Sequence, residues 1–303
     1  MKGERTFLPV IGGDFSIPMT VLNGKNPGKT GLITSGIHSE EFVGIESAIR
    51  LAGELGEEQL FGKLYILHPL NLPGFQSSIR NSMVPEDGKN LNRVFPGNKE
   101  GSLSERIAYT VMSAFSEGID FAIDLHGGQV HEELLPHVYF LGESKEEVKE
   151  TSLLMARHCK VPYIIQSKTT TGGLYNCLSM QGVPSILLER GCQGRWSEEE
   201  VKANLEDLKN LLRLQGMLKD GMAPEERAGE IMQKLIYVNA PYEGCWYPKK
   251  KPGERVLLGE VLGEIRDYHG EKLWELRAEK EGHLLYQISF LSVHKDEELL
   301  VYG

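Results

Sequence analysis

Short apolar runs alternate with amphipathic helical patterns up to about residue 233, and this alternation limits the possible folds more than any other feature. Helical patterns occupy 41–55, 104–118, 146–159 and 197–218. Strands that alternate with helices in this way predict an α/β sheet covered by helices on both faces. The predicted strands are GLITS (31–35), KLYILH (63–68), FAIDL (121–125), HVYFL (137–141), PYIIQ (162–166) and SILLE (185–189).

The pattern changes after residue 233. From there on the sequence shows no helical periodicity, only short β-like runs interrupted by Gly, Pro and charged residues. Two segments, 240–265 and 278–303, are alike, since each begins Ala-x-x-x-Gly and each ends in a turn followed by an apolar strand. We therefore predict an α/β domain over 1–233 and, over 234–303, a small all-β barrel or sandwich of two similar halves.

The β-rich tail resembles the barrel-sandwich fold of biotinyl and lipoyl carriers. Those carriers present a modifiable lysine at the tip of a hairpin between two halves. The corresponding stretch here is RDYHGEKLWEL, in which Lys272 lies in no recognisable attachment motif. A carrier function is therefore not expected.

Charge and composition argue against several classes of partner. The formal net charge is −10, and KKK at 249–251 is the one short basic run, so we expect no nucleic-acid partner. There is no signal-peptide pattern at MKGERTFLPV and no uncharged run long enough to cross a bilayer, so we expect a cytoplasmic protein without a membrane partner. The scattered cysteines predict free thiols, since no CxxC spacing occurs among Cys159, Cys177, Cys192 and Cys245.

Polar groups gather where predicted strands end, at the edge where open α/β sheets bind ligands. GIHSEE (36–41) offers the imidazole of His38 and the carboxylate of Glu41, which both suit Zn²⁺. IDLHGG (123–128) offers His126, with Asp124 on the same face of the strand to orient an imidazole. Such a set predicts a metal site with one open position, although each pair alone also fits an ordinary polar strand end.

A long loop at 71–97 and the strand end PSILLERG (184–191) add charged groups. The loop carries Arg80 and Arg93, which could bind a substrate carboxylate and face a developing negative charge, or could simply pair with surface acids. Glu189 either pairs with Arg190 or Arg195 or serves as a proton carrier.

The segment HEELLPH (131–137) is a tempting metal motif, but it does not fit one. Its histidines are six residues apart with Pro136 between them, so they cannot share a helical face as HExxH requires. We therefore discount His131 and His137 as metal ligands.

Together and in this order, these segments resemble the succinylglutamate desuccinylase and aspartoacylase family, which is related to the zinc carboxypeptidases. The resemblance spans about residues 30–191, and the β-rich tail agrees with it. It implies a zinc-carboxypeptidase-like three-layer α/β/α domain with a mixed central sheet. The segments that carry it are GIHSEE, NLPGF…R…DGKNLNRVFPG, DLHGG and LLERG.

The resemblance also implies roles for individual residues and one zinc ion per subunit. His38, Glu41 and His126 would bind the zinc, and Glu189 would act as general base and proton shuttle. Asn92 and Arg93 would bind the carboxylate of a small anionic substrate, while Arg80 would polarise the scissile carbonyl. The implied activity is hydrolysis of the amide bond of a small N-acylated amino acid.

Three features depart from the family pattern. Aspartoacylases carry an arginine about ten residues before the catalytic glutamate, whereas CLSMQG (177–182) contains none, which argues against N-acetylaspartate as the substrate. The gap between Arg80 and Arg93 is also longer than in aspartoacylases. The family also has an active-site tyrosine, and its candidates in this sequence are Tyr242, Tyr247 and Tyr286.

Two other functions remain as alternatives. A metallocarboxypeptidase would use the same zinc and Arg93 on peptide C-termini, and a β tail over the site would disfavour it. A non-catalytic binding module would lack a metal or a catalytic group, and this sequence contains all of them. The oligomeric state is open, and a homo-oligomer is one option.

Overall fold

The computed structural model describes residues 3–78, 81–227 and 229–303. Within these ranges, nine strands form one large mixed sheet, in the order β1-β2-β4-β3-β5-β9-β7-β8-β10. Its centre is parallel, since β4, β3, β5 and β9 pair in parallel, whereas β1-β2-β4 and β7-β9 are antiparallel. The strands are β1 (Glu4–Pro9), β2 (Ser16–Asn23), β3 (Asn26–Ser35), β4 (Phe61–Pro69), β5 (Phe121–His126), β7 (His137–Leu141), β8 (Tyr163–Ser167), β9 (Ser185–Glu189) and β10 (Glu230–Met232).

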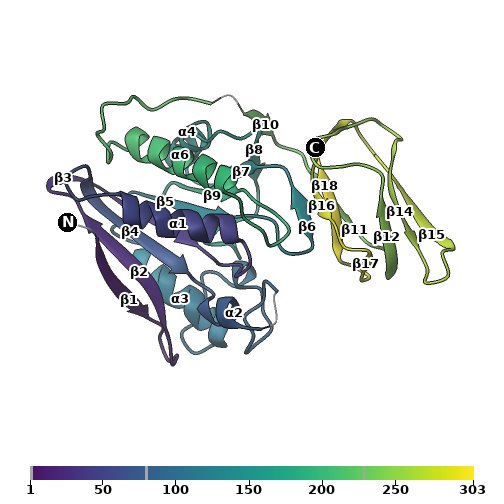
Figure 1. Ribbon diagram of the computed structural model, residues 1–303, viewed down its shortest axis with the longest axis horizontal. Helices are drawn as coiled ribbons and strands as arrows, with labels where there is room; N and C mark the ends of the chain where they lie inside the picture. Colours follow the sequence, from purple (N-terminus) through teal and green to yellow (C-terminus); the bar gives the residue numbers. More distant parts are fainter. Residues whose placement is uncertain (1–2, 79–80, 228) are drawn as a thin grey trace.

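Helices cover both faces of this sheet (Figure 1). Leu51, Met155 and Leu208 pack on one face, and Ile107 and Leu178 pack on the other. Strand β5 is buried along its whole length because helices lie above and below it. The first face carries α1 (Phe42–Glu54), α4 (Glu146–Ala156) and α6 (Glu198–Leu214), and the second carries α3 (Leu103–Phe115) and α5 (Leu174–Met180).

Local sequence sets the helix ends. Ser102 caps the N-terminus of α3, where its N–H donates to the Glu105 carboxylate at 2.8 Å. Ser197 caps the N-terminus of α6, where its hydroxyl accepts from the Glu200 N–H at 3.3 Å. Helix α6 ends at Leu214, before the predicted end at 218. Gly216 adopts φ +73° there, a conformation that a side chain disfavours, and so terminates the helix.

Two antiparallel sheets follow the large one in the C-terminal part of the chain. The first has the order β11-β18-β16-β13, and β6 also pairs with β16; the second has the order β15-β14-β12-β17. Their strands are β11 (Ile236–Asn239), β12 (Gly244–Pro248), β13 (Arg255–Val256), β14 (Val261–Arg266), β15 (Lys272–Arg277), β16 (Gly282–Ile288), β17 (Ser292–Val293), β18 (Glu298–Tyr302) and, from the earlier part of the chain, β6 (Glu132–Leu134).

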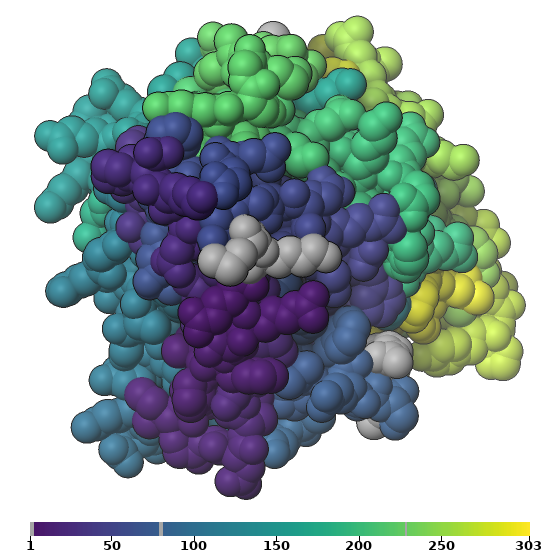
Figure 2. All heavy atoms as spheres, turned by 60° about the vertical axis from the view of Figure 1, so that its left-hand side comes forward, coloured from purple at the N-terminus to yellow at the C-terminus, as the bar shows by residue number. Residues whose placement is uncertain are grey.

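The C-terminal sheets enclose a small core of their own around the buried Trp246. Gly263 lies against its ring, where a Cβ atom would come within 2.1 Å of an indole carbon, so only glycine fits. In Figure 2 the N-terminal strands face the viewer and the C-terminal segment lies along the right-hand edge. The expected α/β sheet and the additional β-rich region are therefore both present, while the domain boundary near residue 233 stays a prediction.

No helix in the described ranges is both long enough and apolar enough to span a lipid bilayer.

Candidate active site

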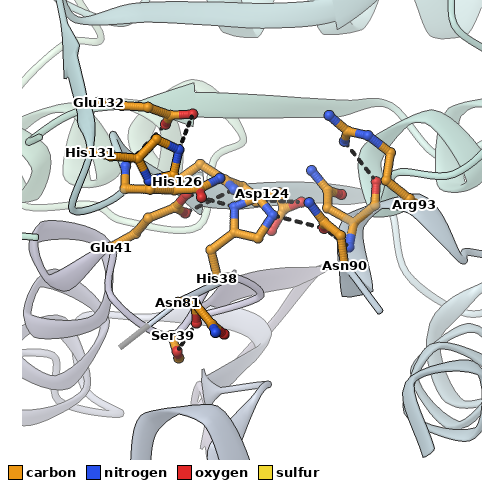
Figure 3. A network of polar contacts seen from close by, with 12 residues as sticks. His38, Ser39, Glu41, Asn81, Asn90, Arg93, Asp124, His126, His131 and Glu132 are labelled. Atoms are coloured by element: carbon orange, nitrogen blue, oxygen red, sulfur yellow. Dashed lines mark hydrogen bonds and ion pairs between the residues drawn. The ribbon is translucent and has the colours of Figure 1, made fainter. Parts of the chain in front are cut away.

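His38, Glu41 and His126 come together at one end of the large sheet (Figure 3). His38 and Glu41 lie in the turn between β3 and α1, and His126 is the last residue of β5. Because β3 and β5 are parallel neighbours, their carboxyl ends meet at the same edge. One ligand atom from each residue lies within 4.8 Å of the others, and all three side chains are buried. We call these three residues the triad.

Each imidazole of the triad turns one nitrogen inward and one outward. The inward atoms are the two Nδ1 atoms, which lie 2.6 Å (His38) and 2.9 Å (His126) from the Glu41 carboxylate. The outward Nε2 atom of His38 lies 3.0 Å from the Asn90 amide oxygen, and that of His126 lies 3.2 Å from the Asp124 carboxylate. Asn90 and Asp124 can each accept a hydrogen bond from an Nε2 N–H, which leaves the two Nδ1 lone pairs as the atoms that would bind a metal ion beside Glu41.

The residues of the triad therefore fit a divalent cation. Two imidazole lone pairs and one carboxylate converge, and these donors suit zinc. Burial raises the pKa of Glu41, but His38 and His126 lower it more, so that it falls to about 2. Burial lowers the pKa of His126, yet Glu41 and Asp124 raise it well above its usual value. The site thus attracts positive charge, either as a proton or as a metal ion.

A second layer of hydrogen bonds holds the triad in place. Thr34 on β3 donates to Asp124 on β5 at 2.7 Å, and the two residues are paired in the sheet register. Asp124 is 1% exposed, so its carboxylate depends on these buried partners. Asp124 therefore takes the orienting position expected from the sequence.

Glu189 lies beside the triad. It is the last residue of β9 and pairs in register with His126 on the neighbouring strand. Its Oε2 is buried without a hydrogen-bond partner in the described part of the chain. Burial raises its pKa well above the usual value; His126 opposes this, whereas Glu41 reinforces it.

Arg190 does not neutralise Glu189. Its guanidinium is buried and donates to Asp207 at 2.6 Å and to Asn204 at 2.8 Å. No ion pair of Glu189 occurs among the described residues. Neither Arg190 nor Arg195 forms an ion pair with Glu189 in the described part of the chain, so the pairing alternative is wrong, and the carboxylate is available to the site.

The loop before α3 brings Asn92 and Arg93 to the same cavity, on the 3-10 turn η1 (Leu91–Arg93). Arg93 is exposed and donates to the Asn92 carbonyl at 3.0 Å, with no carboxylate partner in the described ranges. Asn90 accepts from the Asn92 N–H at 2.8 Å and from His38, so it ties this loop to the triad. The other predicted loop residue, Arg80, lies outside the described residues.

A cavity of about 310 Å³ opens over the triad and Glu189. The C-terminal strands supply part of its wall, through Tyr237, Tyr286 and Glu298. Of the tyrosines left open by the sequence, Tyr286 lines the cavity, whereas Tyr242 and Tyr247 do not. The strands after His126 contribute Glu132, His137 and Tyr139, and α5 contributes Tyr175 and Asn176.

Sequence reasoning missed several of these residues. Asn90 had a local indication, because Asn at a turn start before Leu-Asn-Arg is a typical cap. His137 was discounted as a metal ligand, and it is not part of the triad, yet it lines the cavity. Tyr237 and Glu298 had no local indication, since only the packing of the C-terminal sheet brings them here.

The fold and the site together define an α/β protein with a candidate catalytic metal centre partly enclosed by C-terminal β-strands. Residues 27–215 match the succinylglutamate desuccinylase/aspartoacylase catalytic domain. The chain belongs to the succinylglutamate desuccinylase/aspartoacylase family, as the sequence resemblance predicted.

Individual relatives match almost the whole chain. An N-alpha-acetyl-L-2,4-diaminobutyric acid deacetylase from Halomonas elongata is 27% identical over 303 residues, covering 95% of this chain and 86% of that protein. The product-bound ectoine utilization protein EutE (DoeB) from Ruegeria pomeroyi is similar with a TM-score of 0.87 and 23% identity, over 96% of this chain and 90% of that one. A succinylglutamate desuccinylase/aspartoacylase from Rhodobacter sphaeroides has a TM-score of 0.86 and 24% identity, over 99% and 94% of the two chains.

Proposed function

We propose that this protein is a zinc-dependent amidohydrolase that removes the acyl group from a small N-acylated amino acid. One observation carries the proposal: Glu189, whose Oε2 has no hydrogen-bond partner among the described residues, lies beside the buried triad and lines a cavity that Arg93 also lines. The named activity of the Halomonas elongata relative, a deacetylase of an N-acetylated amino acid, supports the same reaction class. A zinc-carboxypeptidase-like arrangement of the catalytic part and a cytoplasmic location belong to this proposal.

His38, Glu41 and His126 would hold the zinc. When bound, the ion would supply Lewis-acid chemistry, polarising the amide carbonyl and making water more acidic. Asp124 and Asn90 keep the two rings oriented toward it, because each accepts a hydrogen bond from an outward Nε2.

Glu189 is placed to move the proton. Its raised pKa lets the carboxyl group take a proton from the attacking water and keep it until the amide nitrogen departs. The leaving nitrogen then receives that proton, which completes cleavage of the C–N bond. Because Arg190 is bonded to Asp207, its guanidinium does not compete for this proton-carrying group.

Arg93 and Asn92 would bind the substrate carboxylate. The Arg93 guanidinium has no ion-pair partner among the described residues, and a bidentate carboxylate would satisfy it. Asn92 is 8% exposed and lines the same cavity, and its amide NH2 group is the donor that would bond to a carboxylate. We assign Arg80 to the carbonyl oxygen on the family pattern alone.

The test is a comparison of substrates and metal content. Purified protein, with and without a chelator, is assayed for amine release from N-acetyl amino acids and from dipeptides, and its zinc is measured by elemental analysis. We expect hydrolysis of the N-acetyl compounds, loss of activity with the chelator and recovery with zinc. Turnover of dipeptides only would favour a carboxypeptidase, and activity unaffected by metal removal would contradict the proposal.

A further inference from the structure

A second cavity, of about 250 Å³, lies against the first turns of α3 and shares no described lining residue with the cavity over the triad. Three segments that are distant in the sequence contribute to it besides α3: the turn between β1 and β2, helix α2 (Leu72–Gln76) and the loop before α3. Helices α2 and α3 lie next to each other in Figure 1. We call this second space the α3 cavity.

Hydrogen bonds fix the walls of the α3 cavity. The Ile11 N–H, in the turn between β1 and β2, donates to the Thr110 hydroxyl on α3 at 3.1 Å. In the loop, the Asp87 carboxylate accepts from the Ser104 N–H at 2.8 Å and from the Ser104 hydroxyl at 2.7 Å. Both segments are therefore attached to the helix, and the cavity is pre-formed, as is usual for small-molecule sites.

Arg106 on α3 brings an unpaired positive charge to this cavity. It is half-buried, and it is the one Lys or Arg side chain among the described lining residues. Its guanidinium donates from Nη1 to the Gly101 carbonyl at 3.3 Å, and its Nε is buried without a partner in the described part of the chain. Since a guanidinium can donate several charge-assisted hydrogen bonds, most of the bonding capacity of Arg106 is unused.

Asp14 and Glu86 bring negative charge to the same cavity. Both side chains are exposed, and neither forms a hydrogen bond or an ion pair, with Arg106 or any other described residue. Opposite charges thus line one small space without pairing directly. An anion alone would meet two carboxylates and one guanidinium, and a cation alone would leave Arg106 unpaired. A ligand that carries both charges would satisfy both sides.

The rest of the α3 cavity is partly apolar. Phe15, Leu72 and Pro73 are half-buried in its wall, and Leu103 is 6% exposed. Apolar surface of this kind favours a ligand with a hydrocarbon part, because burial removes that part from water. The volume lies just below the usual range of roughly 300–1,000 Å³ for ligand pockets, so it suits a small ligand.

We infer that the α3 cavity is a second binding site, for a free α-amino acid with an apolar side chain. The carboxylate of the amino acid binds Arg106, its ammonium group lies by Asp14 and Glu86, and its side chain packs on the apolar wall. The inference goes beyond the proposed function, because none of these residues belongs to the triad or to the groups proposed for catalysis and substrate binding.

Calorimetric titration of the zinc-loaded full-length protein tests the inference with three probes. L-leucine carries both charges, isocaproate is the same molecule without its ammonium group, and isoamylamine is the same molecule without its carboxylate. We expect the Kd of L-leucine to be at least roughly tenfold lower than that of either analogue, because each analogue loses charge-assisted hydrogen bonds. Equal binding of isocaproate, or no binding of L-leucine, would overturn the inference.

Arginine variants locate the bound amino acid. Arg106→Gln should weaken L-leucine by at least roughly tenfold, since the amide has no positive charge to pair with the carboxylate. Arg157→Gln is the matched control, because Arg157 is exposed at the end of α4 and lines neither cavity. Arg93→Gln should retain L-leucine binding. Loss of binding in Arg93→Gln, with retention in Arg106→Gln, would place the ligand over the triad and contradict the inference.

The double variant Asp14→Asn, Glu86→Gln tests the other charge and serves also if Arg106→Gln does not fold. Both carboxylates are exposed, so their replacement should leave the fold intact. We expect the preference for L-leucine over isocaproate to disappear, and a preference that survives would contradict the assignment. None of these titrations involves hydrolysis of an amide, so their failure would leave the proposed function standing.

Discussion

The two sides of the cavity are built differently. The catalytic side consists of buried residues at the ends of parallel strands, and buried side chains such as Thr34 and Asp124 hold them in place. The opposite side comes partly from antiparallel strands of the C-terminal sheets, where Tyr237 is 52% exposed and Glu298 is also exposed. Rigid positioning serves bond cleavage, whereas an exposed wall can change without disturbing it. Substitutions on the catalytic side should therefore affect metal content and turnover. Substitutions on the side formed by the C-terminal strands should affect substrate selectivity or local stability.

His126→Ala should have the largest effect on the catalytic side. It removes one of three convergent donors, so we expect the metal to be lost and turnover to fall by at least about 1000-fold. Elemental analysis and steady-state assay measure the two effects. His269→Ala is the control, because His269 lies on an exposed turn of the C-terminal region. Full metal content in His126→Ala would contradict the assignment of the triad.

Glu189→Gln should separate metal binding from proton transfer. The amide keeps the shape of the side chain but cannot carry the proton, so we expect kcat to fall by roughly 10²–10⁴-fold while zinc content stays unchanged. Glu206→Gln on the exposed face of α6 serves as the control. Wild-type turnover in Glu189→Gln would show that another group carries the proton.

Asp124→Asn tests the second layer behind the triad. An amide can present either a donor or an acceptor to His126 Nε2, so the ring loses its fixed orientation and we expect metal affinity to fall by about 10–100-fold. Competition with a chelator measures this change. Asp120→Asn is a matched control, because Asp120 precedes the opposite end of β5 and accepts from the Thr30 N–H at 2.7 Å. Equal weakening by both substitutions would indicate a general loss of stability instead.

Gly263→Ala should produce the smallest effect, confined to the C-terminal side. The new methyl group would meet the Trp246 ring at 2.1 Å, so we expect the free energy of unfolding to fall by about 1–3 kcal/mol while metal content is retained. Gly53→Ala in α1 is the control, since nothing lies within 4 Å of its added Cβ. That variant should match or slightly exceed wild-type stability, because alanine favours a helix. Thermal unfolding compares the two, and loss of zinc in Gly263→Ala would show that the sides are not independent.

The sequence predicted the centre of the fold better than its edges. Central strands such as β5 and β9 are uninterrupted apolar runs because both of their faces are buried, and this makes them easy to recognise. The edge strand β1 and its neighbour β2 were missed: β1 is mostly exposed, and β2 contains Pro18. Helix α5 was missed as well, since its seven residues are too short to show a helical period.

The same contrast holds for the candidate site. His38, Glu41, His126 and Glu189 follow recognisable strands, so the parallel pairing of those strands explains why the structure brings them together. The roles of these residues, and of Asn92 and Arg93, stay predictions until they are tested. Tyr237 and Glu298 could not be foreseen, because nothing local in an antiparallel segment says which sheet it will pack beside.

The pairing of β6 with β16 has a consequence for how substrates enter. Backbone hydrogen bonds link the two regions where Leu135 N–H donates to Leu285 at 2.8 Å and Ser289 N–H donates to His131 at 2.7 Å. These bonds attach the segment just after His126 to the C-terminal sheet. The sheet therefore cannot move away from the cavity as a hinged lid without breaking backbone hydrogen bonds. Access of substrates to the cavity must then depend on the side chains around its opening. The width of that opening limits the size of molecule that can enter.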